Sequence, residues 1–376
     1  MTEMFLSEFI DFNPTVRLPK DTIASFVPMD SVIPWHRDVV AAESKPYTGG
    51  TKFLDGDVLL ARITPSLENG KTSIYRAAES ARTEPAFGST EFIVARGIEG
   101  ISDTEYIYYL LRTDQIRSVA IASMTGSSGR QRVQLDTLES TLWDLPDLVE
   151  QQQIAATLGA LDDKIESNRR AMTLAQDLGD ALFEQVDSSH VKLEEIAEIV
   201  MGTSPKGEFL NETGNGLPFY QGTRDFGFRF PTLRVWTTEP KRQANANDVL
   251  LSVRAPVGDL NRASQTCCIG RGIAAIRSVD FPSTLYYAMR GSTNVWEKFN
   301  AEGTVFGSVK KTDVHEALIK WPKCENLAPL EERLSVIDRR IASLERETQY
   351  LATLRDCLLP ELMSGRASVR VMEVFG

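Results

Sequence analysis

The sequence contains few cysteines and no long apolar run. Its 376 residues include four cysteines, Cys267, Cys268, Cys324 and Cys357, and none of them belongs to a CxxC pair. This pattern indicates neither a disulfide framework nor a zinc site, and a reducing cytoplasm is the expected location. No stretch approaches the roughly 18 apolar residues of a membrane span. The opening segment, MTEMFLSEFIDFNP, lacks the basic start of a signal peptide.

The motifs of DNA-modifying catalysis are also absent. The NPTV segment at residues 13–16 lacks the second proline and the aromatic residue of an amino-methyltransferase loop, and Pro146-Asp147 is not followed by the Glu-x-Lys of a nuclease. There is no Walker A loop for ATP. The adjacent thiols of Cys267 and Cys268 have no evident base partner, so buried structural thiols are expected. The three histidines, His36, His190 and His315, are far apart in the sequence. We therefore predict no catalytic residue and no metal site in this chain.

An excess of basic residues is missing as well. The net charge is −11, whereas binding to DNA phosphates requires lysine and arginine. The acidity lies mainly in the first half and in residues 147–190, while residues 191–330 are slightly basic. If the chain binds DNA, partner proteins are expected to supply much of the positive charge.

An internal repeat organises what is present. Three pairs of segments correspond: LSEFIDF (6–12) with LEEIAEI (193–199), GDVLLARITP (56–65) with NDVLLSVRAP (247–256), and TGSSGRQRVQLDTL (125–138) with EGTVFGSVKKTDV (302–314). Each half therefore contains its own globular part, with short strands separated by loops rich in Gly, Pro and Asn.

Each half closes with a long helical pattern. Apolar positions recur with one 4-3-4-3 spacing and one offset of 176 residues, at Ile154, Leu158, Leu161, Ile165, Met172, Ala175 and Leu182, and at Leu330, Leu334, Ile337, Ile341, Leu344, Leu351 and Leu358. The spacing predicts two helices of roughly 45 Å whose seams pack on each other or on partners. Asn168 and Thr348 fall on this seam. They are either tolerated there in contact with solvent or fix the register.

The expected fold class is α+β, with two globular α/β domains separated by two long antiparallel coiled-coil helices in a pseudo-twofold repeat. The expected boundaries are a first domain at 1–148, a central helical spacer at 149–188, a second domain at 189–327, a C-terminal helical spacer at 328–366 and a tail at 367–376.

Several polar loops carry side chains that suit DNA. Arginine reads guanine, glutamine or asparagine reads adenine, and Ser, Thr and Lys contact phosphates. The candidates in the first half are Arg62, Thr64, Lys71, Arg76, Ser127, Ser128, Arg130, Gln131 and Arg132. Those in the second half are Tyr220, Gln221, Thr223, Arg224, Arg254, Arg271, Ser308, Lys310 and Lys311. Each of these loops is open to a second interpretation, in which its side chains pair with local acids such as Asp136 or Asp313, or are simply solvated.

The chain resembles the specificity subunits of type I restriction–modification systems over about residues 5–366. The resemblance is carried by EQQQIAATLGALDDKIESNRR in the first half and by NDVLLSVRAPVGDLN, CIGRGIAAIR, GTVFGSVKKTDV, LEERLSVIDRRIASLE and LLPELMSGR in the second. It implies two target-recognition domains that each read half of a split, asymmetric sequence in double-stranded DNA. It also implies docking of methylation subunits, two in number, which bind S-adenosylmethionine and carry the catalytic loop. Restriction subunits that translocate and cut DNA are a further expected partner.

Two alternatives remain open at this stage. One is a coiled-coil adaptor that binds only proteins and has no DNA specificity. The other is a catalytic methyltransferase or nuclease, against which the missing motifs argue. A salt-sensitive, sequence-dependent affinity for DNA distinguishes a specificity subunit from an adaptor.

Overall fold

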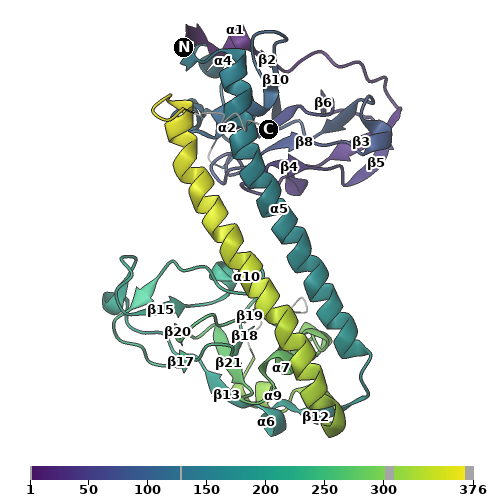
Figure 1. Cartoon of the computed structure of the whole chain (residues 1–376), viewed down its shortest axis with the longest axis vertical. Coiled ribbons are helices and arrows are strands. Elements are labelled where there is room, and N and C mark those ends of the chain that lie inside the picture. Colours follow the sequence, from purple (N-terminus) through teal and green to yellow (C-terminus); the bar gives the residue numbers. More distant parts are fainter. Residues whose placement is uncertain (1, 128, 301–308, 369–376) are drawn as a thin grey trace, which may run out of the picture. The chain divides into compact units, whose positions relative to one another are not determined.

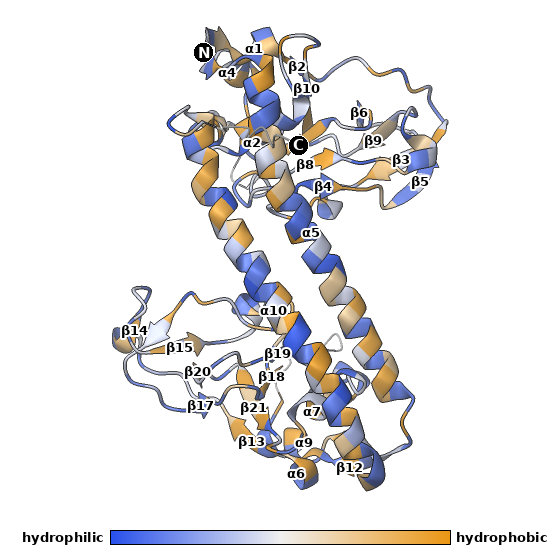
Figure 2. Cartoon of the chain, viewed as in Figure 1, coloured by the Kyte–Doolittle hydropathy of each residue, from blue (hydrophilic) through white to orange (hydrophobic). Residues whose placement is uncertain are grey.

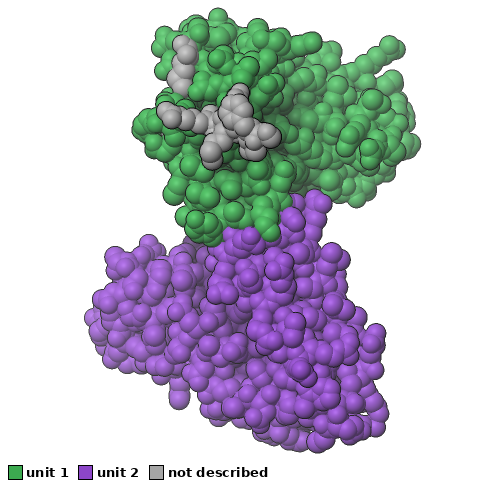
Figure 3. Space-filling view, in the orientation of Figure 1, with its two compact units in different colours: residues 1–165, 350–376 green, residues 166–349 purple. Residues whose placement is uncertain are grey.

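The computed structural model describes residues 2–127, 129–300 and 309–368. The chain divides into two compact units, residues 1–165 with 350–376 (unit 1) and residues 166–349 (unit 2), which Figure 3 shows in different colours. Two long helices, α5 (Leu148–Glu184) and α10 (Cys324–Met363), each contribute one part to unit 1 and the other part to unit 2 (Figure 1). This confirms the prediction of two α/β domains and two long helices that pack together.

Unit 1 is built from short, mostly antiparallel strands. One sheet has the order β2-β10-β7-β8-β4, a second has the order β5-β3-β9-β6, and β1 pairs with β11. The strands are β1 (Thr2–Phe5), β2 (Ile10–Phe12), β3 (Ile23–Val27), β4 (Asp38–Val39), β5 (Glu43–Pro46), β6 (Thr51–Phe53), β7 (Val58–Ala61), β8 (Thr72–Tyr75), β9 (Ala86–Gly88), β10 (Phe92–Gly97) and β11 (Leu142–Leu145). The helices are α1 (Leu6–Phe9), α2 (Thr104–Arg112), α3 (Asp114–Ala122) and α4 (Leu135–Glu139).

Unit 2 repeats this plan. Its sheets have the orders β13-β21-β18-β19 and β14-β16-β15-β20-β17, and β12 pairs with β22. The strands are β12 (Ser188–Lys192), β13 (Glu198–Met201), β14 (Leu210–Asn211), β15 (Leu217–Tyr220), β16 (Trp236–Thr237), β17 (Gln243–Ala244), β18 (Val249–Ser252), β19 (Leu260–Arg262), β20 (Cys267–Ile269), β21 (Ile273–Arg277) and β22 (Leu318–Pro322). The helices are α6 (Leu193–Ile196), α7 (Pro282–Arg290), α8 (Asn294–Glu297) and α9 (Lys311–His315).

The paired GDVLL and NDVLL segments form the same turn and strand in both units. Gly56 and Asn247 have positive φ values of 88° and 75°, which glycine and asparagine tolerate best. The aspartate that follows each of them is buried and pairs with an arginine on a neighbouring strand, Asp57 with Arg96 in unit 1 and Asp248 with Arg277 in unit 2. The turn thus places the apolar strands β7 and β18 in the cores.

The apolar seams of the long helices are buried against the domains as well as against each other. Ile154 and Leu158 join the unit 1 core that contains α2, while Leu334, Ile341 and Leu344 join the unit 2 core that contains β18 and α7. Figure 2 shows hydrophobic and hydrophilic residues alternating along both helices. Ile165 and Ile337 are buried too, whereas Leu161 is only half-buried.

Polar contacts within each unit give the direction of the two helices. Asp162 of α5 lies 2.6 Å from Arg355 of α10 in unit 1, and the Asn168 amide donates to Glu347 at 3.0 Å in unit 2. The residue number therefore rises along α5 as it falls along α10, as expected for antiparallel helices. Asn168 is only 1% exposed, which supports its role in fixing the register.

Candidate nucleic-acid interface

Three loops of unit 2 meet at the end of strand β18. The Val253 N–H donates to the Gly272 carbonyl at 2.9 Å, and the Val309 N–H donates to the Val253 carbonyl at 3.0 Å. Arg254, Arg271 and Lys310 are the immediate neighbours of these three residues, so these backbone bonds bring the three loops with their basic side chains to one place.

This part of unit 2 carries unpaired positive charge. The basic side chains of its loops are exposed, namely Arg224, Arg254, Arg271, Lys310 and Lys311. None of the five has an ion-pair partner in the part of the chain that the structure describes. Asp313 accepts the backbone N–H of Lys310 at 2.8 Å and does not neutralise its side chain. Free guanidinium and ammonium groups on adjoining loops suit contact with phosphates or base edges.

The side chain of Gln221 is held in place beside the same loops. Its side-chain oxygen accepts a hydrogen bond from Ser204 at 2.7 Å, and the Ser204 hydroxyl oxygen accepts the Arg271 N–H at 3.2 Å. The backbones of these loops approach so closely that a Cβ at Gly202 would lie 2.1 Å from the Gly270 carbonyl oxygen. Thr223 and Arg224 follow in a short 3₁₀ turn, Thr223–Asp225. Tyr220 is 2% exposed and packs in the core instead, where burial raises the pKa of its hydroxyl.

Unit 1 contains the same three-loop junction at the end of β7. The Arg62 N–H donates to the Glu91 carbonyl, and the Val133 N–H donates to the Arg62 carbonyl, both at 2.9 Å. The Thr64 N–H donates to the Gln131 carbonyl at 3.0 Å. The structure therefore brings together four of the candidate residues of the first half, Arg62, Thr64, Gln131 and Arg132.

The junction of unit 1 is less basic than that of unit 2. The Arg132 guanidinium forms a two-pronged ion pair with Glu91 at 2.5 and 2.9 Å, and this pairing lowers the pKa of Glu91. Asp136, the acid expected beside this loop, is not the partner of Arg132. Arg130 is exposed without an ion-pair partner among the described residues. The Arg62 guanidinium is half-buried and lies 3.5 Å from the Val133 carbonyl.

Two candidates of the first half are bonded away from this junction, and one candidate of each half lies outside the described residues. The Lys71 ammonium donates to the Met29 carbonyl at 2.9 Å, and Arg76 pairs with Asp38 and Glu105 at 2.9 and 2.7 Å. Ser127 is exposed in the loop before α4. Ser128 and Ser308 lie outside the described residues.

Comparison with known proteins places the chain in a family. A model described as the type I restriction modification DNA specificity domain matches residues 40–173. The MjaX type I restriction enzyme specificity subunit of Methanocaldococcus jannaschii is 26% identical over 346 residues, which cover 85% of this chain and 80% of that subunit. The EcoEI specificity subunit of Escherichia coli is 30% identical over 202 residues, which are 51% of this chain and 33% of that subunit.

The chain belongs to the type I restriction–modification specificity subunits. The fold agrees, because the S subunit of a type I system from M. genitalium superposes with a TM-score of 0.60 over 96% of this chain and 95% of that chain, at 16% identity. Members of this family are non-catalytic and recognise the DNA target of the complex in which they assemble. The alternatives of an adaptor without DNA specificity and of a catalytic enzyme are therefore wrong.

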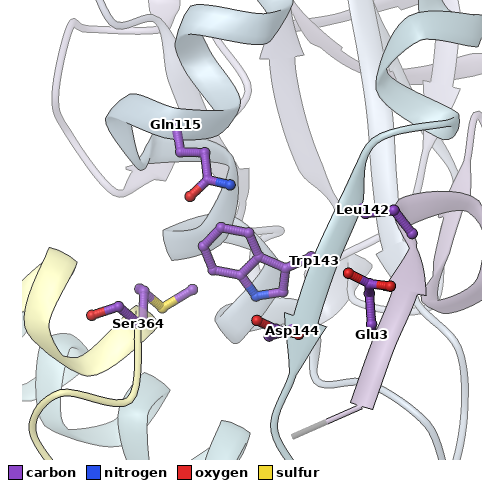
Figure 4. Close-up of a pocket in the computed structure, with 7 residues that line it drawn as sticks. Glu3, Gln115, Leu142, Trp143, Asp144 and Ser364 are labelled. Atoms are coloured by element: carbon purple, nitrogen blue, oxygen red, sulfur yellow. The ribbon is translucent and has the colours of Figure 1, made fainter.

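The burial that the sequence predicts for the adjacent thiols of the specificity subunit is confirmed. Cys267 and Cys268 are buried, and burial raises the pKa of the Cys267 thiol to about 12, so it stays protonated and unreactive. A cavity of 270 Å³ in unit 1 is lined by Trp143 with the acidic Glu3 and Asp144 beside it (Figure 4). Among the described residues, no three His, Cys, Asp or Glu side chains are placed to hold a metal ion. No helix in the described ranges is long and apolar enough to cross a membrane.

Each long helix of the specificity subunit also leaves apolar side chains uncovered. Leu174 and Leu178 of α5 lie one turn apart in unit 2 and are 69% and 53% exposed. Tyr350 of α10, which lies in unit 1, is 67% exposed. Leu174 and Tyr350 differ by 176 residues, the offset of the helical repeat. Uncovered apolar side chains at equivalent positions are typical of a surface that binds a partner.

Sequence reasoning missed the buried charges that join the helices to the domains. Asp162 and Asp338 are 5% and 7% exposed and pair with arginines from other elements. A signal was available, because each aspartate directly follows a seam residue and the two are again 176 positions apart. Their arginine partners, such as Arg355 on α10 and Arg229 in a loop, have no such signal because they lie far in the sequence from the aspartate that each one binds.

Proposed function

We propose that each globular domain reads one half of a split DNA target and that its three-loop junction is the reading surface. The repetition of the junction in both units carries this proposal, since two unrelated surface loops would not share the same backbone hydrogen bonds. In unit 2 the contacting side chains are Gln221, Arg254, Arg271, Lys310 and Lys311. In unit 1 they are Arg62, Thr64, Arg130, Gln131 and Arg132.

The different charges of the two junctions support different modes of contact. The free basic groups of unit 2 suit phosphates and guanine edges. In unit 1 the Glu91 carboxylate holds the Arg132 guanidinium in place, which favours directed contact with a base edge over general attraction to phosphate.

Salt titration of DNA binding tests the reading surface. In the complex assembled with its methylation subunits, Lys310→Ala or Lys311→Ala should weaken binding to all sequences equally and reduce the salt slope by about one unit. Arg271→Ala should instead relax preference at one base position and lose roughly 1–3 kcal/mol of discrimination. Lys323→Ala removes a positive charge that pairs with Asp187 away from the junction and serves as the matched control. Titrations that superimpose for all of these variants would remove the junction from the DNA interface.

We further propose that the exposed apolar positions on α5 and α10 dock two methylation subunits, one on each repeat, and that these subunits bind S-adenosylmethionine. Restriction subunits would join the same complex. The support is the repeat itself, which places Leu174 and Tyr350 at equivalent positions.

Truncation of one docking face tests this arrangement. The double variant Leu174→Ser with Leu178→Ser should lose one methylation subunit while its melting temperature changes little, because both side chains are mostly exposed in the free chain. Thr173→Ser, which removes one methyl group on the same turn, should assemble normally. A complex of unchanged stoichiometry and affinity in the double variant would contradict docking at this face.

A further inference from the structure

A buried carboxylate joins three elements in unit 1. Asp162 of α5 is 5% exposed. It lies 2.6 Å from the Arg355 guanidinium of α10, and it accepts the Tyr109 hydroxyl of α2 at 2.7 Å. Arg112, also from α2, lies 4.0 Å away and is itself buried. One aspartate thus contacts both long helices and the globular domain.

Unit 2 contains a second carboxylate of the same kind. Asp338 of α10 forms ion pairs with Arg229 and Arg262, whose side chains are 0% and 4% exposed. Both arginines belong to the globular domain. The Arg229 guanidinium also stacks 4.0 Å from the Tyr286 ring centre and donates to the Tyr287 hydroxyl at 3.2 Å.

The two joints share their aspartate and tyrosines but not their arginines. Asp162 and Asp338 are related by the 176-residue offset, and the pair Tyr108-Tyr109 recurs as Tyr286-Tyr287. In unit 1 one arginine comes from the opposite helix and one from α2, whereas in unit 2 both come from the globular domain. The repeat thus keeps a buried carboxylate where domain and helix meet, whichever elements supply the arginines.

Stability alone does not account for these buried charges. Burying an ion pair costs desolvation, and apolar residues of similar volume often hold such a junction as well or better. A carboxylate that binds guanidinium groups adds direction, because the two oxygens of Asp338 each accept from a different arginine and so fix where both arginines lie. Burial strengthens this preference because water cannot replace either partner.

Angular control matters for reading a split target. One extra base pair between the half-sites moves the second half-site about 3.4 Å along the duplex and turns it by about 35° around the duplex axis. A recognition domain that tilted by a comparable amount on its helices would therefore accept neighbouring spacer lengths.

We infer that Asp162 and Asp338 are positioning residues, which fix the angle of each recognition domain on its helices and thereby set the spacer length that the complex accepts. The inference rests on the proposed function, in which each domain reads one half-site. Neither aspartate is a DNA contact, because both are buried beneath the surface.

Three changes at the unit 2 joint separate positioning from stability. Asp338→Asn keeps the shape but takes from two buried arginines the carboxylate with which both form ion pairs. The triple variant Asp338→Leu, Arg229→Met, Arg262→Met replaces the joint with apolar side chains. Arg262→Lys keeps the charge but loses the guanidinium that bonds Asp338 and the Asn247 carbonyl at the same time. Asp280→Asn, an exposed aspartate of the same unit, is the matched control.

The measurement is methylation by the complete complex on targets whose spacer length varies in single base pairs, together with the melting temperature. Asp338→Asn should melt lower and discriminate less between spacer lengths, by about tenfold. The triple variant should regain stability and still accept neighbouring spacer lengths. Arg262→Lys should also accept neighbouring spacer lengths, with little change in melting temperature. The bases read within each half-site should not change in any variant.

Other results would contradict the inference or the proposed function on which it rests. If the triple variant or Arg262→Lys assembles and keeps the spacer profile of the unmodified complex, the aspartate has only a structural role and the inference is wrong. Arg262→Lys decides the matter if the triple variant does not assemble. An unmodified complex that reads no split target would contradict the proposed function instead, so the two failures are distinguishable.

Discussion

At the scale of single residues, the two long helices differ where the repeat would make them alike. Arg355 on α10 corresponds to Gly179 on α5 by the 176-residue offset. Arg355 fills its position with a guanidinium that pairs with Asp162. Gly179 leaves the equivalent position empty, and Tyr287 occupies the space: a Cβ at Gly179 would lie 2.3 Å from the tyrosine ring. The same place in the repeat therefore holds an ion pair in one unit and a ring against backbone in the other.

This difference predicts that one helix glycine cannot be replaced. Alanine is usually better than glycine inside a helix by up to about 1 kcal/mol. Gly179→Ala should nevertheless destabilise unit 2 by about 1–3 kcal/mol, because Tyr287 must move. Gly159→Ala on the same helix is the control, since its Cβ would lie no closer than 3.4 Å to the flexible end of Arg37. Chemical denaturation should show opposite signs, and equal effects would contradict the packing at Gly179.

Glu345 of α10 gives a residue-scale prediction of pH dependence. It is 7% exposed, one of its oxygens has no partner among the described residues, and burial raises its pKa. In the unfolded chain it titrates near about 4.3. Between that pH and the higher pKa of the folded state, only the folded state keeps the proton. Stability is therefore lost as the pH rises through this interval and stays lower above it.

Glu345→Gln should accordingly raise the melting temperature near neutral pH and have less effect at about pH 4, where the glutamate is mostly protonated in both the folded and the unfolded state. The Phe230 N–H, which donates to Glu345 at 3.4 Å, can still donate to the glutamine oxygen. Thermal unfolding at the two pH values is the measurement, with the exposed Glu332→Gln as control. A stabilisation of the same size at both pH values would exclude titration of Glu345 as its cause.

At the scale of elements, periodicity predicted which helix positions are buried but not what buries them. Ile154, Leu158 and Ile341 are buried as their spacing indicates, yet much of what covers them is domain core. A 4-3-4-3 pattern encodes an apolar stripe, and any apolar surface can cover it. The loops at the strand ends could likewise be predicted only one at a time, because a linear pattern does not show which loops meet. Their meeting depends on hydrogen bonds such as Val253 with Gly272, which join residues distant in the sequence.

The helix burial gives an ordered prediction for two seam variants. Ile341 is fully buried, so Ile341→Asp should place a carboxylate among apolar side chains and cost several kcal/mol, of order 3 or more. Leu161 is half-buried, so Leu161→Asp leaves its carboxylate near water and should cost clearly less. Urea denaturation of both variants checks the order. A larger loss for Leu161→Asp would show that the seam faces another direction.

At the scale of the whole molecule, the boundaries between the two compact units fall within the long helices and not at their ends. The helix α5 begins in unit 1 and ends in unit 2, and α10 does the reverse. Sequence reasoning assigned both helices to separate spacers, since a linear pattern cannot show which domain a helix segment packs on. The strand pair β12–β22 closes unit 2 at the points where its chain leaves α5 and enters α10.

This closure determines how a recognition domain can be exchanged. A graft of residues 191–327 would cut through the register in which Ser188 pairs with Pro322 and Lys192 pairs with Leu318. A graft of residues 185–323, taken from a relative, keeps both strands together and starts and ends at the helices. It also carries Arg229 and Arg262, so the relative must supply arginines that reach Asp338.

Such a hybrid should change one half of the methylated DNA target and leave the other half intact, because each unit carries its own three-loop junction. Sequencing of methylated sites in cells that express the hybrid or the unmodified chain is the measurement. The shorter graft serves as a comparison and should assemble poorly, since its first strand, β12, is divided between two proteins. A 185–323 hybrid that altered both half-sites, or neither, would show that the two junctions do not read DNA independently.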